Sequence, residues 1–102
     1  MGVDAVWKTE AGQELGRLGD PGMILSGFVS DERRVAGTVC LRFIDAYGDA
    51  CFNQLQLPVL VEELSAAAQA EGEPELRDHL EALAAFARGS SEMHTYVWFI
   101  GD

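Results

Sequence analysis

The residues with the widest chemical range in this sequence are two histidines and two cysteines: His79, His94, Cys40 and Cys51. A nucleophilic site needs a serine, cysteine or threonine beside a base that a third group orients. Neither histidine lies in a recognisable nucleophile motif, and His79 follows Asp78 in a pattern typical of a solvated helical histidine. A thiol–imidazole pair with His94 would require adjacent strands, which the sequence alone does not establish. We therefore predict no catalytic residues.

Oxygen ligands for a cation could come from the stretch DAYGDACFN, in which Asp45, Asp49 and Asn53 recur at four-residue steps. This spacing departs from the calcium-binding loop, and Asp and Gly are the residues that a hairpin turn selects. The segment 16–19 begins and ends with glycine but lacks the lysine of a phosphate-binding loop. We predict neither a metal site nor a cofactor.

The C-terminal stretch MHTYVWFIGD alternates between two kinds of side chain. As a strand, it places one row on each side of a sheet: Met93, Thr95, Val97 and Phe99 on one, and His94, Tyr96, Trp98 and Ile100 on the other. The second row has three explanations. It lies buried under the glycine-rich N-terminal segment, it forms an exposed contact surface, or it lines a ligand or catalytic pocket. His94, Tyr96 and Trp98 are therefore candidate binding residues.

The elements that position these residues begin with two amphipathic helices. Apolar residues recur at helical spacing from Leu57 to Ala68 and again from Leu76 to Ala87. Pro58 and the proline at 74 suit the first turns of these helices. A short linker over 70–74 predicts that they form an antiparallel hairpin.

Strands are predicted at 3–7, at 38–44 and at 50–54, with a weaker one at 23–29. A turn over 45–49 joins the strands at 38–44 and 50–54 as a hairpin. Residues 9–22 and 30–37 are predicted to be loops. The fold class is α+β: an antiparallel or mixed sheet of about four to five strands with a C-terminal αα-hairpin on one face and a final strand.

The chain has the size and composition of one globular domain over residues 1–102, with 48 % hydrophobic and 24 % charged residues. Charged side chains interrupt the first thirty residues, so we expect no signal peptide. No apolar run approaches the roughly 20 residues that span a bilayer. The expected location is a reducing cytoplasm, with both cysteines as buried, unpaired thiols.

Charge is the most unbalanced property, with 17 acidic residues against 7 basic ones and a formal net charge of -10. Such a field repels nucleic acid and anionic lipid and attracts basic proteins. Positions 62 to 92 contain eight carboxylates and two arginines, which gives this segment a net charge of -6. The candidate acidic binding residues on the helices are Glu62, Glu63, Glu71, Glu73, Glu75, Asp78 and Glu81.

The segment FNQLQ at 52–56 and the ending HTYVWFIGD at 94–102 resemble the shared core and C-terminus of small, acidic, uncharacterised bacterial proteins. The resemblance covers about half of the chain. It implies a bacterial cytoplasmic origin, and it implies no activity, cofactor, partner or site residue.

Our leading hypothesis is a non-catalytic protein-binding module of the immunity, antitoxin or adaptor type, whose acidic helix face meets a basic protein. The alternative is a small-ligand-binding or enzymatic domain with a pocket near His94, Tyr96 and Trp98. A homodimer joined through the sheet is the third hypothesis. The negative charge could also serve solubility alone, without any binding partner.

Overall fold

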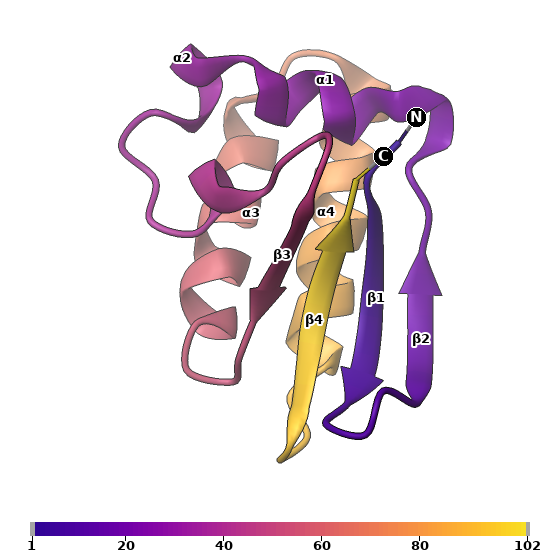
Figure 1. Ribbon diagram of the computed structural model, residues 1–102. Helices are drawn as coiled ribbons and strands as arrows, with labels where there is room; N and C mark the ends of the chain where they lie inside the picture. The colour runs from indigo at the N-terminus through magenta and orange to yellow at the C-terminus, as the bar shows by residue number, and fades with distance from the viewer. Residues whose placement is uncertain (1, 102) are drawn as a thin grey trace.

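A four-stranded antiparallel sheet forms one layer of the protein, with its strands in the order β2-β1-β4-β3 (Figure 1). The computed structural model describes residues 2–101. The strands are β1 (Asp4–Thr9), β2 (Glu14–Leu18), β3 (Asp49–Phe52) and β4 (Thr95–Ile100). The last strand of the chain therefore lies inside the sheet, paired along one edge with β1 and along the other with β3.

Helices α3 (Leu57–Ala70) and α4 (Pro74–Gly89) form an antiparallel hairpin behind the sheet (Figure 1). Two shorter helices, α1 (Ile24–Ser30) and α2 (Glu32–Val35), cross one end of the molecule. Short 3-10 turns occur at η1 (Pro21–Met23) and η2 (Leu41–Phe43). The architecture is α+β with a C-terminal helix pair, as predicted. No helix within residues 2–101 is long and apolar enough to cross a membrane.

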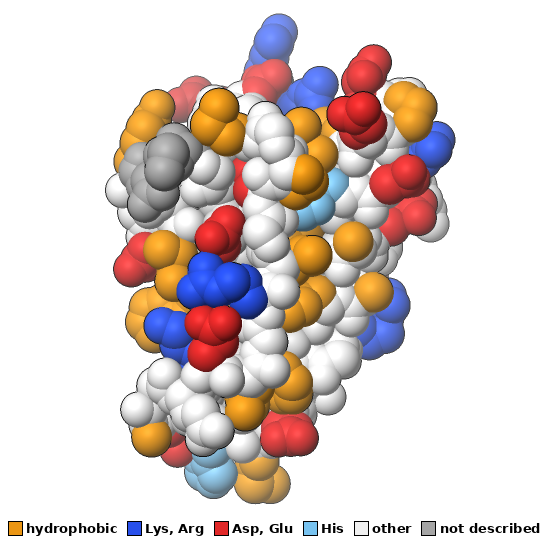
Figure 2. Space-filling view, turned by 90° about the vertical axis from the view of Figure 1, so that its right-hand side faces the viewer, with side chains coloured by type: hydrophobic (Ala, Val, Ile, Leu, Met, Phe, Trp, Pro, Cys, Tyr) orange, Lys and Arg blue, Asp and Glu red, His pale blue; other side chains and the backbone are white. Residues whose placement is uncertain are grey.

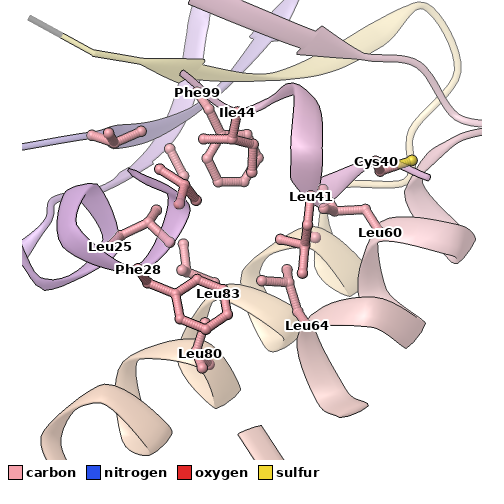
Figure 3. Close-up of a cluster of buried hydrophobic side chains, with 14 of the residues drawn as sticks. Leu25, Phe28, Cys40, Leu41, Ile44, Leu60, Leu64, Leu80, Leu83 and Phe99 are labelled. Atoms are coloured by element: carbon pink, nitrogen blue, oxygen red, sulfur yellow. The ribbon is translucent and has the colours of Figure 1, made fainter. Parts of the chain in front are cut away.

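The two long helices follow directly from their sequences. A proline occupies the first turn of each, where a missing N–H costs no hydrogen bond. The apolar positions at helical spacing face the sheet, and Leu64, Leu80 and Leu83 are almost completely buried. Figure 3 shows the side chains of the core converging from α3, α4 and β4.

The alternation of β4 is confirmed over Thr95–Ile100. Thr95, Val97 and Phe99 are buried against the helices, and the residues between them are half-buried on the opposite face. The Phe99 ring meets the ring of Phe52 edge-on, with 5.8 Å between their centroids. Met93 departs from the prediction, because it precedes the strand and 76 % of it is exposed.

The predicted strand at 23–29 is wrong, because this segment forms α1. Its buried residues are Leu25, Phe28 and Val29, which follow the i, i+3, i+4 spacing of a helix. Gly27 is exposed and is tolerated within the helix. The helical spacing overrides the β-branched and aromatic composition on which the strand prediction rested.

The predicted strand at 38–44 and its hairpin with 50–54 are also wrong. The segment turns through η2, with Leu41 and Ile44 buried while Val39 and Phe43 are about 60 % exposed. A strand would bury alternate residues, and this pattern does not alternate. Strand β3 pairs with β4 instead.

Part of the predicted loop at 9–22 is strand β2, which pairs with β1 through a turn around Gly12. The φ angle of Gly12 is 90°, in the left-handed region that glycine adopts readily. The N-terminal segment thus extends the sheet sideways. It does not cover the face that carries Tyr96 and Trp98 (Figure 1), so the first of the three explanations of that row, burial beneath this segment, is wrong.

Candidate functional site

The face of the sheet opposite the helix pair carries Tyr96, Trp98 and Ile100 from β4, all half-buried. Trp98 lies between Val6 of β1 and Cys51 of β3 in the strand register. We call this row of β4 side chains the open sheet face. Figure 1 shows no helix of residues 2–101 packed over the open sheet face. Its exposure is compatible with a contact surface.

Charged residues flank the open sheet face. Arg17 lies 3.0 Å from a carboxylate oxygen of Asp4 and 3.1 Å from one of Glu14. The hydrogen bond from Arg17 lowers the pKa of the Glu14 carboxyl. The ammonium of Lys8 lies 5.6 Å from the centroid of the Trp98 ring, in cation–π geometry. Charges on an edge strand such as β2 also discourage unwanted strand pairing.

His94 does not belong to the aromatic row. It lies in the turn before β4 with a φ angle of 59°, and its Nδ1 is 3.1 Å from the Glu10 carboxylate. Its side chain is 73 % exposed. His94 therefore lies outside the strand that carries Tyr96 and Trp98, the residues with which the sequence grouped it into one candidate pocket.

Two of the candidate acidic residues hold the fold together. The carboxylate of Glu63 accepts hydrogen bonds from the backbone N–H groups of three consecutive residues, Val39, Cys40 and Leu41, at 2.5, 2.9 and 3.0 Å. Glu63 therefore anchors the start of η2 to α3. Sequence reasoning missed this role because the partners lie over twenty positions away.

Glu71 is the second structural carboxylate. Its oxygens accept hydrogen bonds from the Arg34 guanidinium at 3.1 Å and from the backbone N–H of Glu73 at 3.0 Å. Its side chain is only 11 % exposed. Glu71 thus joins α2 to the linker between α3 and α4, and it is less accessible to a partner than the sequence predicted.

The variant Glu63→Ala is expected to lower the free energy of unfolding by about 2 kcal/mol, because three backbone donors lose a charged acceptor. Chemical denaturation measures this loss. The neighbouring variant Glu62→Ala is the matched control: Glu62 is exposed, so its loss should stay within about 0.5 kcal/mol. Equal losses at both positions would contradict the structural role of Glu63.

The carboxylates that remain exposed just before and in the first half of α4 form what we call the acidic surface: Glu73, Glu75, Asp78 and Glu81. Figure 2 shows one group of acidic side chains at the upper right, on the helix side, and others on the opposite side of the molecule beside Lys and Arg side chains. Arg77 partly balances them, with its Nε 3.5 Å from Asp78. Glu62 lies in the first half of α3, away from the linker that precedes α4, and does not join this group.

A hollow of about 590 Å³ borders the acidic surface. It is lined by Glu75, Asp78 and His79 of α4 and by Pro21, Gly22 and Ile24 of the segment leading into α1. The rim therefore combines two carboxylates with apolar and glycine positions.

His79 is buried, which corrects the prediction of a solvated histidine. Only 6 % of the residue is exposed, and its Nε2 lies 3.7 Å from the Asp20 carboxylate without a hydrogen-bond partner. Burial lowers its pKa, and the negative charge of Asp20 opposes that effect. The signal was present in the sequence, since His79 lies three residues after Leu76 and four before Leu83, on the apolar stripe of α4.

The two cysteines are free, as predicted, and they differ in burial. Cys40 is buried, whereas Cys51 is exposed on the edge strand β3, which corrects its predicted burial. Desolvation raises the pKa of both thiols, and the charge of Glu63 raises that of Cys40 further. The protonated thiol is thus favoured at neutral pH, and a thiol is a weaker nucleophile than a thiolate.

Carboxylate and amide oxygens of the DAYGDACFN stretch serve turns. Asp45 accepts a hydrogen bond from the N–H of Tyr47 at 2.9 Å, and Asn53 accepts them from the N–H groups of Leu55 and Gln56. Within residues 2–101, no group of three or more His, Cys, Asp and Glu side chains is arranged to hold a metal ion.

The fold and the site together define a small α+β domain with an antiparallel sheet, one helix-covered face and one open face. Comparisons with protein-family models, curated proteins and solved structures gave no match for the chain. Its function therefore has to be inferred from its own surfaces.

Proposed function

We propose that this chain is a non-catalytic protein-binding module of the immunity, antitoxin or adaptor type, which presents its acidic surface to a basic protein. The observation that carries the proposal is the group of exposed carboxylates just before and in the first half of α4, Glu73, Glu75, Asp78 and Glu81, in a chain of net charge -10. The same charge argues against nucleic acid and anionic membranes as partners. A bacterial cytoplasmic setting belongs to the proposal and is supported by the resemblance of the 52–56 and 94–102 segments.

The physical effect of this surface is expected on the rate of association. A single exposed ion pair contributes about 0–1 kcal/mol, so affinity from each carboxylate alone is small. A field from several charges of one sign raises association rates by roughly 10- to 1,000-fold at low salt. Tight binding would then depend on apolar contacts, for which the hollow beside Glu75 and Asp78 offers Pro21 and Ile24.

Affinity capture with matched charge variants tests the proposal. The wild-type chain and the control D49N/E62Q/E92Q, which alters three exposed carboxylates outside the acidic surface, should retain the same basic protein from a lysate at low salt. The variant E75Q/D78N/E81Q carries the same net charge as the control and should lose that protein. Retention by all three chains, or capture of acidic proteins only, would contradict the proposal.

The open sheet face supports a second candidate role as a contact surface, including a homodimer joined through the sheet. Aromatic residues such as Tyr96 and Trp98 are enriched where proteins dock. Light scattering over a range of concentrations tests the homodimer, and a constant monomer mass would exclude it. A ligand or enzymatic pocket near His94, Tyr96 and Trp98 is the remaining alternative, and the position of His94 in an exposed turn beside Glu10 gives it less support.

A further inference from the structure

The side chain of Asp20 joins two segments of the chain at one point. Its carboxylate accepts hydrogen bonds from the backbone N–H of Val3 at 3.0 Å, just before β1, and from those of Leu25 and Ser26 at 2.8 and 3.0 Å, in the first turn of α1. The side chain is completely buried. Asp20 therefore fixes the start of α1 to the start of the first strand.

His79 brings α4 to the same point. Its side chain is 5 % exposed and its Nε2 lies 3.7 Å from Oδ1 of Asp20, beyond hydrogen-bond distance. Two further charged residues approach the region, Glu75 and Asp78, which line the same hollow from α4 itself. The segment from Pro21 to Ser30, which packs against His79, contains no titratable side chain.

A neutral imidazole fits this position better than a charged one. Burial removes the water that would solvate an imidazolium. The carboxylate oxygens of Asp20 already accept hydrogen bonds from three backbone N–H groups. The pKa of His79 is consequently below its ordinary value of 6.5. Between that folded pKa and 6.5 the unfolded or opened chain binds more protons than the closed one, so the closed state loses stability as pH falls below 6.5.

We propose that the buried His79–Asp20 pair is a pH-sensitive junction between α4 and α1, which is closed at neutral pH and opens locally under mild acid. The open state exposes both side chains to water and loosens the first turn of α1. Short peripheral helices such as α1 are the elements that open locally before the whole chain unfolds. Because Glu75 and Asp78 line the same hollow, opening also reshapes the acidic surface, a consequence that rests on the proposed function.

The junction is tested by NMR on the free full-length chain, so the result does not depend on any partner. Imidazole signals give the pKa of His79, and amide hydrogen exchange gives the protection factors of Leu25 and Ser26, corrected for intrinsic exchange rates. When the pH is lowered from about 7.5 to about 5.5, the protection factors of both amides should fall several-fold. The limit of this fall is about tenfold for each unit by which folding lowers the pKa of His79. The variant His79→Gln should show a much weaker pH dependence.

The matched control is His94→Gln, which removes the exposed histidine and should retain the wild-type pH dependence. The variant Asp20→Asn should lower the pKa of His79 further, because the charge that favours the imidazolium is gone. A His79 pKa at or above its ordinary value would overturn the junction, as would protection that does not change with pH or changes equally in His79→Gln. If either variant fails to fold, the wild-type imidazole titration together with the wild-type protection factors decides the matter.

Discussion

Phe99→Ala is expected to lower the free energy of unfolding by about 3–5 kcal/mol, the loss typical of a large aromatic residue removed from a packed core. Only 1 % of Phe99 is exposed, and it lies on the helix side of β4 with its ring edge-on to Phe52. Figure 3 shows it among the core side chains contributed by both long helices. Denaturant unfolding followed by circular dichroism measures the loss.

Trp98→Ala provides the matched comparison one residue earlier in the same strand. Trp98 is larger than phenylalanine but lies half-buried on the open sheet face. Its removal leaves no closed cavity, so the expected loss is about 1 kcal/mol, less than half that of Phe99→Ala. Losses of similar size at the two positions would mean that the open sheet face is covered in solution.

Reversing the charge of the acidic surface is expected to slow binding of the basic partner strongly. The variant E75K/D78K/E81K replaces three exposed carboxylates of α4 with ammonium groups. The association rate at low salt should fall by about 100-fold, because attraction in the encounter becomes local repulsion. Stopped-flow or surface-binding kinetics with the captured protein measures this rate.

The control for charge reversal is D49K/E62K/E92K, which changes the net charge equally at exposed positions outside the acidic surface. Compared at about 0.1 M salt, where interactions beyond about 10 Å are largely screened, its association rate should fall much less than that of E75K/D78K/E81K. If the two variants slow association equally, net charge alone drives binding and the acidic surface has no special role.

The sequence predicts the elements whose periodicity is strong and local. Helices α3 and α4 combine apolar residues at helical spacing with Pro58 and Pro74 in their first turns. Strand β4 combines period-two alternation with β-branched and aromatic residues. In each element, local preference and tertiary packing favour the same structure, and the predictions were confirmed.

The errors occur where composition and spacing disagree. The segment around Leu25 and Phe28 is rich in strand-forming residues, but its apolar spacing is helical, and it packs as α1. The segment around Leu41 also suggests a strand, yet its N–H groups bond to the Glu63 carboxylate on α3. A long-range side-chain acceptor of this kind leaves no local pattern, so no single-sequence rule could have found η2.

The candidate site was predicted in outline only. The sequence identified the acidic residues of the helix pair, but it could not show that Glu63 and Glu71 bond within the fold while Glu75 and Asp78 remain exposed. The burial of His79 was within reach, since it shares the apolar stripe of α4. Its polar side chain led to the opposite interpretation.

The most direct test of the proposed function is the association rate of the wild-type chain with its captured partner as a function of ionic strength, beside E75Q/D78N/E81Q. We predict a wild-type rate that falls steeply from about 10 mM to about 1 M salt and converges there with the rate of the variant, because screening removes the contribution of the acidic surface. A wild-type rate that does not change with salt, or that matches the variant at every salt concentration, would contradict the proposal.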